Sequence, residues 1–185
     1  MKPSVYHIQY KIESWHWWFV GRKRILLKQI EKVFRKKPTI SILDVGCGTG
    51  GIIVSLSKFG KAIGVDNSFE ALKFCYAKRI KSLCQAAVPF LPFREEAFDL
   101  VLAIDLLEHL DDDEDGLKEF WRVLVKSGKI IIFVPAFKFL WGIQDEVGLH
   151  RRRYSLSELK EKVEKSGFKI LRISYFNFFL FPIIL

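Results

Sequence analysis

Apolar runs and amphipathic stretches follow one another along the chain in a regular alternation. Short, mostly apolar runs that end at an acid, a glycine or a proline predict buried strands over 40–45, 61–66, 98–104 and 130–134, with a shorter strand near 83. Stretches with helical spacing lie between them, and Ser155 with Glu158 forms a capping box at the start of the last one. The alternation predicts a Rossmann-like three-layer α/β/α sandwich with a mostly parallel central sheet of six to seven strands.

The two ends of the chain extend this prediction. Residues 13–37 are expected to form one long helix with a broad apolar stripe, ended by Pro38. Residues 168–175 are expected to form a sixth strand. The apolar tail 177–185 is predicted to form a seventh strand or to contact a membrane or a second copy of the chain; a truncated chain is the other interpretation.

The chain is interpreted as a single domain, 1–185, with four segments. These are a cap helix (1–38), a cofactor-binding core (39–134), an insertion on the substrate side (135–154) and a C-terminal helix, strand and tail (155–185).

A glycine-rich turn follows the first predicted strand. Gly46, Gly48 and Gly50 let the backbone adopt positive φ and approach a ligand closely, and the helix that begins after them offers unpaired N–H groups. The spacing also fits a dinucleotide-binding fingerprint, since Asp66 follows Gly46 by 20 residues. Asp44 argues against that reading, because a carboxylate beside the turn repels a diphosphate and suits a cation.

Four motifs resemble those of the class I S-adenosylmethionine-dependent methyltransferases. They are Leu-Asp-Val-Gly-Cys-Gly-Thr-Gly at 43–50, Gly-Val-Asp at 64–66, Leu-Pro-Phe at 91–93 and Phe-Asp-Leu-Val at 98–101. The resemblance implies an enzyme that moves the methyl group of S-adenosylmethionine to an O, N or C nucleophile, leaving S-adenosylhomocysteine. On its motifs, the cofactor would be held by Asp44, Gly46, Cys47, Gly48 and Asp66.

Further residues are predicted to surround the cofactor. Asp66 ends its strand where a carboxylate accepts ribose hydroxyls, and Asn67 and Ser68 cap the next helix beside it. In the resembled family an acidic residue commonly accepts a hydrogen bond from the adenine amino group at the position where this chain has Ala87. Backbone groups near Ala87 and Val88 are therefore expected to bind the adenine instead.

An aromatic segment, Trp15-His16-Trp17-Trp18-Phe19 followed by Arg22, is similar to one found in a methyltransferase subfamily of bacteria and archaea. Trp18 is predicted either to pack in the core or to cover the sulfonium by cation–π attraction, and Arg22 to bind the cofactor's carboxylate.

The reaction side is predicted at the end of the strand 98–104. Asp105 and His109 fit the family's Asp-x-x-Glu-His element and are the predicted catalytic residues, and Asp105 is also a predicted cofactor contact. His109 is the candidate general base, with a structural hydrogen bond as its alternative role. The insertion supplies candidate substrate contacts, Trp141, His150, Arg152 and Tyr154, the last three from a His-Arg-Arg-Arg-Tyr-Ser motif that the same subfamily shares. Arginine suits an anionic acceptor, and a surface salt-bridge cluster is the alternative.

Charge, cysteine content and the lack of a targeting segment bear on the binding partner, on metal binding and on the location of the protein. The net charge of +9 is concentrated in the first long helix and at Arg151–Arg153. Nucleic acid, an anionic membrane surface or a phosphorylated substrate would each explain these basic clusters, and a solvated basic face without a partner is the alternative. The predicted acceptor is a small molecule that is anionic or lipid-linked, and nucleic acid is not favoured. The three cysteines form no C-x-x-C pair and the acidic run 111–115 suits a helix start, so no metal site is predicted. The absence of a signal peptide or spanning segment predicts a cytoplasmic location.

Three other functions fit parts of the sequence. A cofactor-binding module without catalysis would dock RNA or a membrane through its basic helix. An NAD-dependent oxidoreductase would need a hydride-handling pair such as Tyr-x-x-x-Lys, which the chain lacks. Aminopropyl transfer on the same fold would need acidic polyamine contacts, and none is identified.

Overall fold

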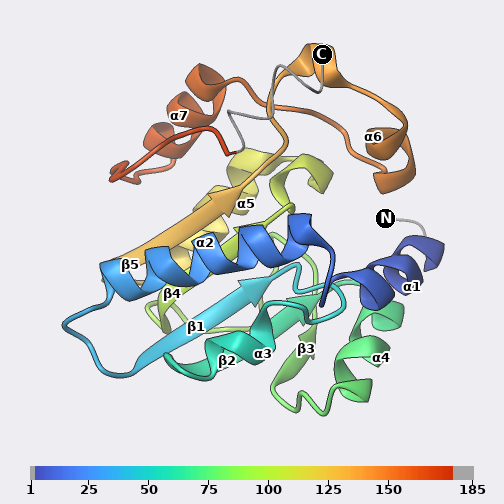
Figure 1. The fold of residues 1–185 in the computed structure, drawn as a ribbon. Coiled ribbons are helices and arrows are strands. Elements are labelled where there is room, and N and C mark those ends of the chain that lie inside the picture. Colours follow the sequence, from blue (N-terminus) through green and yellow to red (C-terminus); the bar gives the residue numbers. More distant parts are fainter. Residues whose placement is uncertain (1–2, 177–185) are drawn as a thin grey trace.

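The computed structural model describes residues 3–176 and contains one parallel sheet with the strand order β3-β2-β1-β4-β5 (Figure 1). Its strands are β1 (Ile40–Val45), β2 (Gly60–Asp66), β3 (Leu83–Gln85), β4 (Phe98–Ile104) and β5 (Leu124–Phe133). The predicted sandwich and the positions of the first four strands are therefore confirmed. The fifth strand begins earlier than predicted, because Leu124 already pairs with Phe98; a register irregularity separates this pair from Leu100–Lys129.

Helices and short 3-10 turns connect the strands. They are α1 (Pro3–Ile12), α2 (Trp17–Val33), α3 (Ile53–Leu56), α4 (Phe69–Ala77), η1 (Leu107–His109), α5 (Asp113–Val123), η2 (Lys138–Leu140), α6 (Ile143–Gly148) and α7 (Leu156–Lys165). The predicted capping box at Ser155 and Glu158 is present at the start of α7. Within residues 3–176, none of the helices has the length and apolar character needed to cross a membrane.

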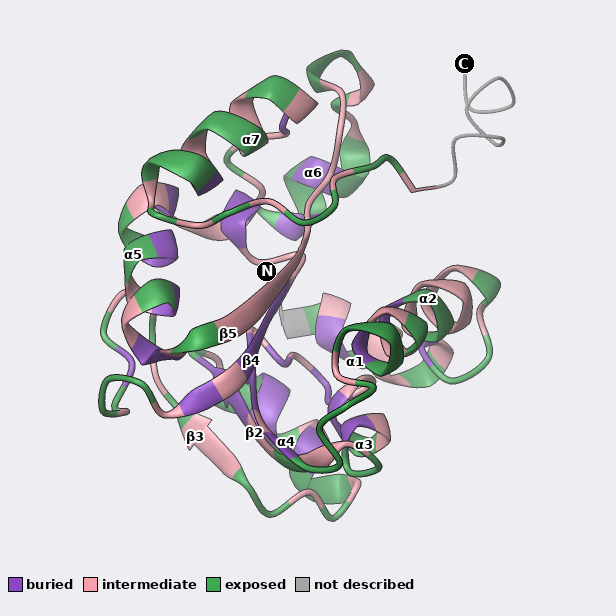
Figure 2. Cartoon of the chain, turned by 90° about the vertical axis from the view of Figure 1, so that its left-hand side faces the viewer, coloured by how far each residue is buried: buried purple, intermediate pink, exposed green. Residues whose placement is uncertain are grey.

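Neighbouring residues of the central strands point to opposite faces of the sheet, and each face is covered by helices. Ile42 and Leu100 pack with Leu26 of α2 and Leu56 of α3 on one face. On the other face, a second cluster joins the sheet to α5 and α7; its members include Leu43, Val101, Phe120 and Val163. Figure 2 shows this burial along β4 and on the side of α5 that faces the sheet.

Strand β1 lies between β2 and β4, so the chain winds outward in both directions from it. Asp44 is paired in register with Gly64 of β2 and Leu102 of β4. The carboxyl ends of β1, β2 and β4 therefore meet at one edge, which is where ligands bind in open sheets of this kind.

The prediction of six to seven strands is wrong for the described residues, which form five. Residues 168–175, predicted as a sixth strand, have no ladder partner there. Their apolar pattern is explained by side-chain packing: the Phe168 ring lies edge-on to Trp121 at 5.0 Å, and Ile170 packs on the core. The tail 177–185, with its predicted strand, membrane or dimer contacts, lies outside the described residues.

The prediction of one helix over 13–37 is also wrong. Residues 13–16 break it, because the Glu13 side chain is buried in contacts with other elements and His16 caps a new helix, its ring nitrogen accepting from Trp18 N at 3.4 Å. An additional helix, α1, precedes the break.

Candidate functional site

The turn after β1 has the backbone that its glycines predicted. Gly46, Gly48 and Gly50 have φ of +72°, +54° and +80°. The N–H groups of Gly46 and Cys47 both donate to Val65 O of β2, at 2.8 and 2.9 Å. These bonds tie the turn to the edge of the sheet, so its shape is fixed.

Asp66 is hydrogen-bonded to this turn from the end of β2. Its carboxylate accepts from Gly48 N and from Ser68 N, each at 2.9 Å. Burial raises the pKa of Asp66, partly offset by these N–H donors. Ser68 caps α4 as predicted, with its hydroxyl accepting from Ala71 N at 3.3 Å.

Asp44 is the unusual group of this edge. It is 2% exposed, and among the residues that the structure describes no hydrogen-bond partner reaches its Oδ2 atom. Burial, with a smaller contribution from Asp66, raises the pKa of Asp44 to about 7. A buried carboxylate with an unsatisfied oxygen costs free energy, and a nearby cation would lower that cost.

Helix α1, which the sequence did not predict, packs against the same turn. Glu13, just after this helix, accepts from Thr49 Oγ1 at 2.7 Å and forms an ion pair with Lys78. Tyr6 is buried close to Asp66, and the Gln9 amide lies beside Gly48: a β-carbon added to Gly48 would be 3.7 Å from Gln9 Nε2. The sequence signal for α1 was the spacing of Tyr6, Gln9 and Glu13, which places the three side chains on one face of a helix.

Arg22 and Asp105 connect α2 to the end of β4. The guanidinium makes two parallel hydrogen bonds to the carboxylate, at 2.6 and 2.7 Å. It also lies over two aromatic rings, 5.3 Å from the centroid of Trp18 and 5.4 Å from that of Phe133. Trp18 and Arg22 are thus brought beside Asp105, and the guanidinium already has a carboxylate partner within the chain.

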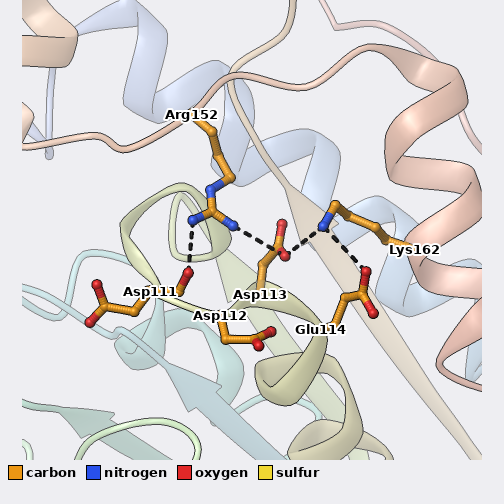
Figure 3. A pocket seen from close by; sticks show the side chains of 6 residues that line it. All are labelled: Asp111, Asp112, Asp113, Glu114, Arg152 and Lys162. Carbon is orange, nitrogen blue, oxygen red and sulfur yellow. Dashed lines mark hydrogen bonds and ion pairs between the residues drawn. The ribbon is translucent and has the colours of Figure 1, made fainter.

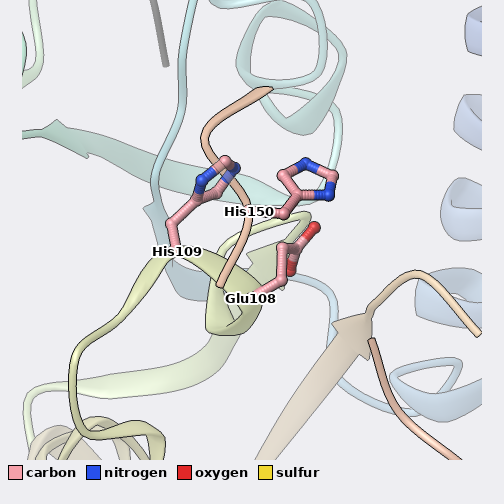
Figure 4. A group of neighbouring side chains, drawn as sticks. All are labelled: Glu108, His109 and His150. Atoms are coloured by element: carbon pink, nitrogen blue, oxygen red, sulfur yellow. The ribbon is translucent and has the colours of Figure 1, made fainter. Parts of the chain in front are cut away.

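Three side chains face one another beside the turn η1 (Figure 4). Glu108 and His109 come from this turn, and His150 follows α6; the two imidazole rings lie 4.8 Å apart at nearly a right angle. Burial and the proximity of His150 lower the pKa of His109 to about 4. Burial and nearby Asp105 raise the pKa of Glu108 well above its usual range. His109 therefore has a neutral imidazole near pH 7, able to accept a proton.

Tyr154 and Arg152, two of the predicted substrate residues, have partners within the protein, and those of Arg152 are drawn in Figure 3. Tyr154 is 3% exposed, and its hydroxyl donates to Asp113 Oδ2 at 2.7 Å. Arg152 donates to the carbonyls of Leu110 and Asp111 and pairs with Asp113 at 3.1 Å. The salt-bridge alternative is thus the one that the geometry favours for Arg152. The acidic run therefore does more than start α5, because Asp113 also binds Arg152 and Tyr154 in the segment before α7.

The remaining candidates lie around the same edge. Trp141 is 44% exposed in the insertion. Ala87 and Val88 follow β3 directly, and Asn67 O accepts from Gln85 Nε2 at 3.1 Å, linking that loop to the end of β2. None of the three cysteines forms a disulfide, and Cys47 and Cys75 are buried in this part of the chain.

Comparison with known proteins indicates the family of this chain. A family model described as a methyltransferase domain matches residues 43–132, the stretch from β1 to β5. An uncharacterised protein of Methanocaldococcus jannaschii is 31% identical over 167 residues, which are 86% of this chain and 80% of that protein. Ajmaline N-methyltransferase of Rauvolfia serpentina is 35% identical over 106 residues, covering 52% of this chain but only 36% of its own length.

Solved structures share the same fold. A SAM-dependent methyltransferase from Thermotoga maritima is 27% identical with a TM-score of 0.63, covering 89% of this chain and 82% of its own. Another from Aquifex aeolicus has a TM-score of 0.69 at 19% identity, covering 93% and 91%. The chain belongs to the class I S-adenosylmethionine-dependent methyltransferases. It is an enzyme of this class, and S-adenosylmethionine is its cofactor.

Proposed function

We propose that the turn after β1 holds the cofactor, and that the enzyme methylates an O, N or C nucleophile of a small acceptor with an apolar portion. The observation that carries the cofactor site is Asp44, a buried carboxylate with an unpartnered oxygen among the described residues, beside three glycines of positive φ. A cationic ligand would lower the free-energy cost of this buried carboxylate, whereas the diphosphate of NAD would place further negative charge beside it.

The turn itself fits an adenosine-bearing ligand. A β-carbon on Gly46 would lie 3.0 Å from Leu106 Cδ1, so only glycine leaves the backbone where it is. Asp66 is already oriented by two N–H donors and keeps lone pairs for ribose hydroxyls. The remaining members of the proposed cofactor site are Cys47, Gly48, Asn67, Ser68, Ala87, Val88 and, from the cap, Trp18 and Arg22.

When bound, S-adenosylmethionine supplies an electrophilic methyl group. The protein then has to bring a nucleophile into line with it and, where that nucleophile carries a proton, remove the proton. His109 is the proposed base, because burial keeps its imidazole neutral at pH 7. A pKa of about 4 makes it a weak base, so it suits an acceptor whose own proton is acidic or leaves as the methyl group moves.

The insertion supports an acceptor with apolar surface. Its side chains Trp141, Ile143 and Leu149 are 44%, 79% and 52% exposed. The neighbouring arginines offer less to an anion, since Arg153 pairs with Asp145 and Arg152 with Asp113 inside the protein. Relatives named as N-methyltransferases of ajmaline and norajmaline favour nitrogen as the atom methylated.

Transfer of radiolabelled methyl from S-adenosylmethionine to a panel of acceptors tests this proposal. The panel contains apolar amines, apolar alcohols, carboxylic acids and tRNA, each with the wild-type protein and His109→Asn. We expect label in the apolar amines or alcohols, and a larger loss in His109→Asn for acceptors that arrive protonated. Label confined to carboxylic acids, or equal rates in the variant, would contradict the acceptor class or the role of His109.

A nucleic-acid acceptor is the second candidate, favoured by one observation. Arg24, Lys28, Lys32 and Lys36 are all exposed along and just after α2. A tRNA methyltransferase of Xenopus tropicalis is 30% identical over 129 residues, which are only 19% of that protein. Label in tRNA, lost as salt rises, would establish this candidate in place of the small acceptor.

A further inference from the structure

Glu108, His109 and His150 form a cluster that the sequence did not predict. One possible ligand atom from each side chain lies within 4.8 Å of the others (Figure 4). Glu108 and His109 are held by η1 and His150 by the loop after α6. The backbone joins these two segments, since Arg151 N donates to Glu108 O at 2.8 Å.

Glu108 lacks the partner that a buried carboxyl group needs. It is 0% exposed, and within residues 3–176 neither of its carboxyl oxygens has a hydrogen-bond partner. Leaving such a buried group without a hydrogen bond costs free energy. Its carboxyl group points toward the imidazoles of His109 and His150 (Figure 4).

His150 is oriented by a second carboxylate. Its Nδ1 lies 2.9 Å from Asp145 Oδ1, and Asp145 is itself fixed by Arg153 at 2.8 Å and by Gly142 N at 2.9 Å. Because Asp145 is paired with a guanidinium, the proton of this contact belongs to the imidazole, and Nε2 keeps its lone pair. A carboxylate that orients a histidine in this way is the usual outer partner of a metal-binding histidine.

Gly148 leaves room at that nitrogen. A β-carbon at this position would lie 2.7 Å from His150 Nε2, so any other residue would crowd the ring. His109 is also oriented, by a hydrogen bond between its ring and the Leu149 backbone. Both rings are therefore held in place by groups outside the cluster.

We infer that Glu108, His109 and His150 bind a divalent transition-metal ion such as Zn²⁺. Two imidazoles and one carboxylate are a ligand set that suits zinc and its neighbours and does not suit Mg²⁺ or Ca²⁺. At metal–ligand distances of about 2.0–2.2 Å the three ligand atoms would lie about 3–4 Å apart, so the side chains close slightly on the ion. Three protein ligands leave a coordination position open.

The open position suggests a use that rests on the proposed function. Both η1 and the cofactor turn follow strands at the same edge of the sheet, and Leu106 packs against Gly46 between them. An ion held by Glu108, His109 and His150 would occupy the lone pair of His109. In the metal-bound enzyme the ion, and not His109, would bind an acceptor oxygen or nitrogen and make loss of its proton easier. Binding of the ion itself does not depend on methyl transfer.

Titration with Co²⁺ tests the inference, using tag-free protein first treated with a chelator. We expect one Co²⁺ per chain, a visible d–d absorption band, and displacement of that band by Zn²⁺. His150→Asn and Glu108→Gln should each weaken binding at least about tenfold, as loss of one ligand does. His7→Asn is the matched control, because His7 is an exposed histidine of α1 outside the cluster.

Circular dichroism and thermal unfolding separate loss of the site from loss of the fold. Zn²⁺ should raise the midpoint of wild type and of His7→Asn but not of folded His150→Asn. Absence of the band in wild type, or unchanged affinity in His150→Asn, would overturn the inference. Calorimetry with S-adenosylhomocysteine on the same samples tests the proposed function separately. Binding of S-adenosylhomocysteine without metal would refute only the metal site, and binding of metal without S-adenosylhomocysteine would refute only the proposed function.

Discussion

Arg22 and Asp105 form a bidentate ion pair between α2 and the end of β4, with N–O distances of 2.6 and 2.7 Å. Asp105 has a φ of +52°, and its N–H donates to Phe133 O at 2.9 Å. The helix that covers the cofactor edge is thereby fixed to the strand end from which the reaction-side residues project.

Removal of this pair should loosen the cap. Arg22→Met and Asp105→Asn should each lower the free energy of unfolding by about 1–2 kcal/mol, with a coupling near 1 kcal/mol in the double variant. Urea unfolding of the four proteins measures this. The exposed pair Lys73 and Glu70, at 2.7 Å, is the control, and its coupling should stay below about 0.5 kcal/mol. Equal coupling for both pairs would contradict a structural role for Arg22 and Asp105.

Asp44 should make the ligand-free protein less stable as pH rises. Its pKa is about 7 in the folded protein and near 3.8 in the unfolded chain, so between these values the folded state holds the extra proton. Stability from this group is therefore complete below pH 3.8 and is lost as pH rises through about 7. The full effect is of the order of 4 kcal/mol.

Asp44→Asn isolates this contribution from other titrating groups. The stability of the variant relative to wild type should rise by about 2–3 kcal/mol between about pH 5 and about pH 8, measured by urea unfolding without cofactor. Parallel stability curves for the two proteins would show that Asp44 does not titrate in this range.

Gly46→Ala should damage the turn, since the new methyl group meets Leu106 Cδ1 at 3.0 Å in a backbone of φ +72°. We expect a loss of about 1–3 kcal/mol in stability together with weaker S-adenosylhomocysteine binding. Gly21→Ala is the matched control, because within the described chain no atom lies within 4 Å of the added carbon. In helix α2 that change should stabilise by up to about 1 kcal/mol. Similar effects of both changes would contradict the packing described for the turn.

Tyr154→Phe should act on stability and leave binding unchanged. The lost hydroxyl leaves Asp113 with Lys162 at 2.7 Å and Arg152 at 3.1 Å, so a cost of about 1–2 kcal/mol is expected. Thermal unfolding measures the loss of stability, and calorimetry with S-adenosylhomocysteine tests whether cofactor binding is unchanged. A raised KM for the acceptor in a protein of wild-type stability would favour the substrate role predicted from the sequence.

The central part of the fold was predictable because its signals are local. The strand 98–104 is an apolar run long enough to be buried on both faces, and Gly46 and Gly48 mark a turn that few other residues can form. The approach of Asp44 and Asp66 to each other followed from the rule that parallel strands end at one edge.

Other features depended on contacts between distant segments. Glu13 ends a helix because Thr49 and Lys78 hold its side chain, which no pattern within 13–37 reveals. Residues 168–175 have the alternation of a strand, yet Phe168 finds its partner in Trp121. The proximity of Glu108 and His150 likewise arises only when the insertion folds back on η1.

Isothermal titration calorimetry with S-adenosylhomocysteine and, in parallel, NAD tests the central claim most directly. Wild-type protein should bind S-adenosylhomocysteine at one site per chain and ignore NAD. Asp44→Asn should bind S-adenosylmethionine at least about tenfold more weakly, as the loss of a buried charge pairing predicts. Binding of NAD by wild type, or full affinity for S-adenosylmethionine in Asp44→Asn, would contradict a site built around this carboxylate.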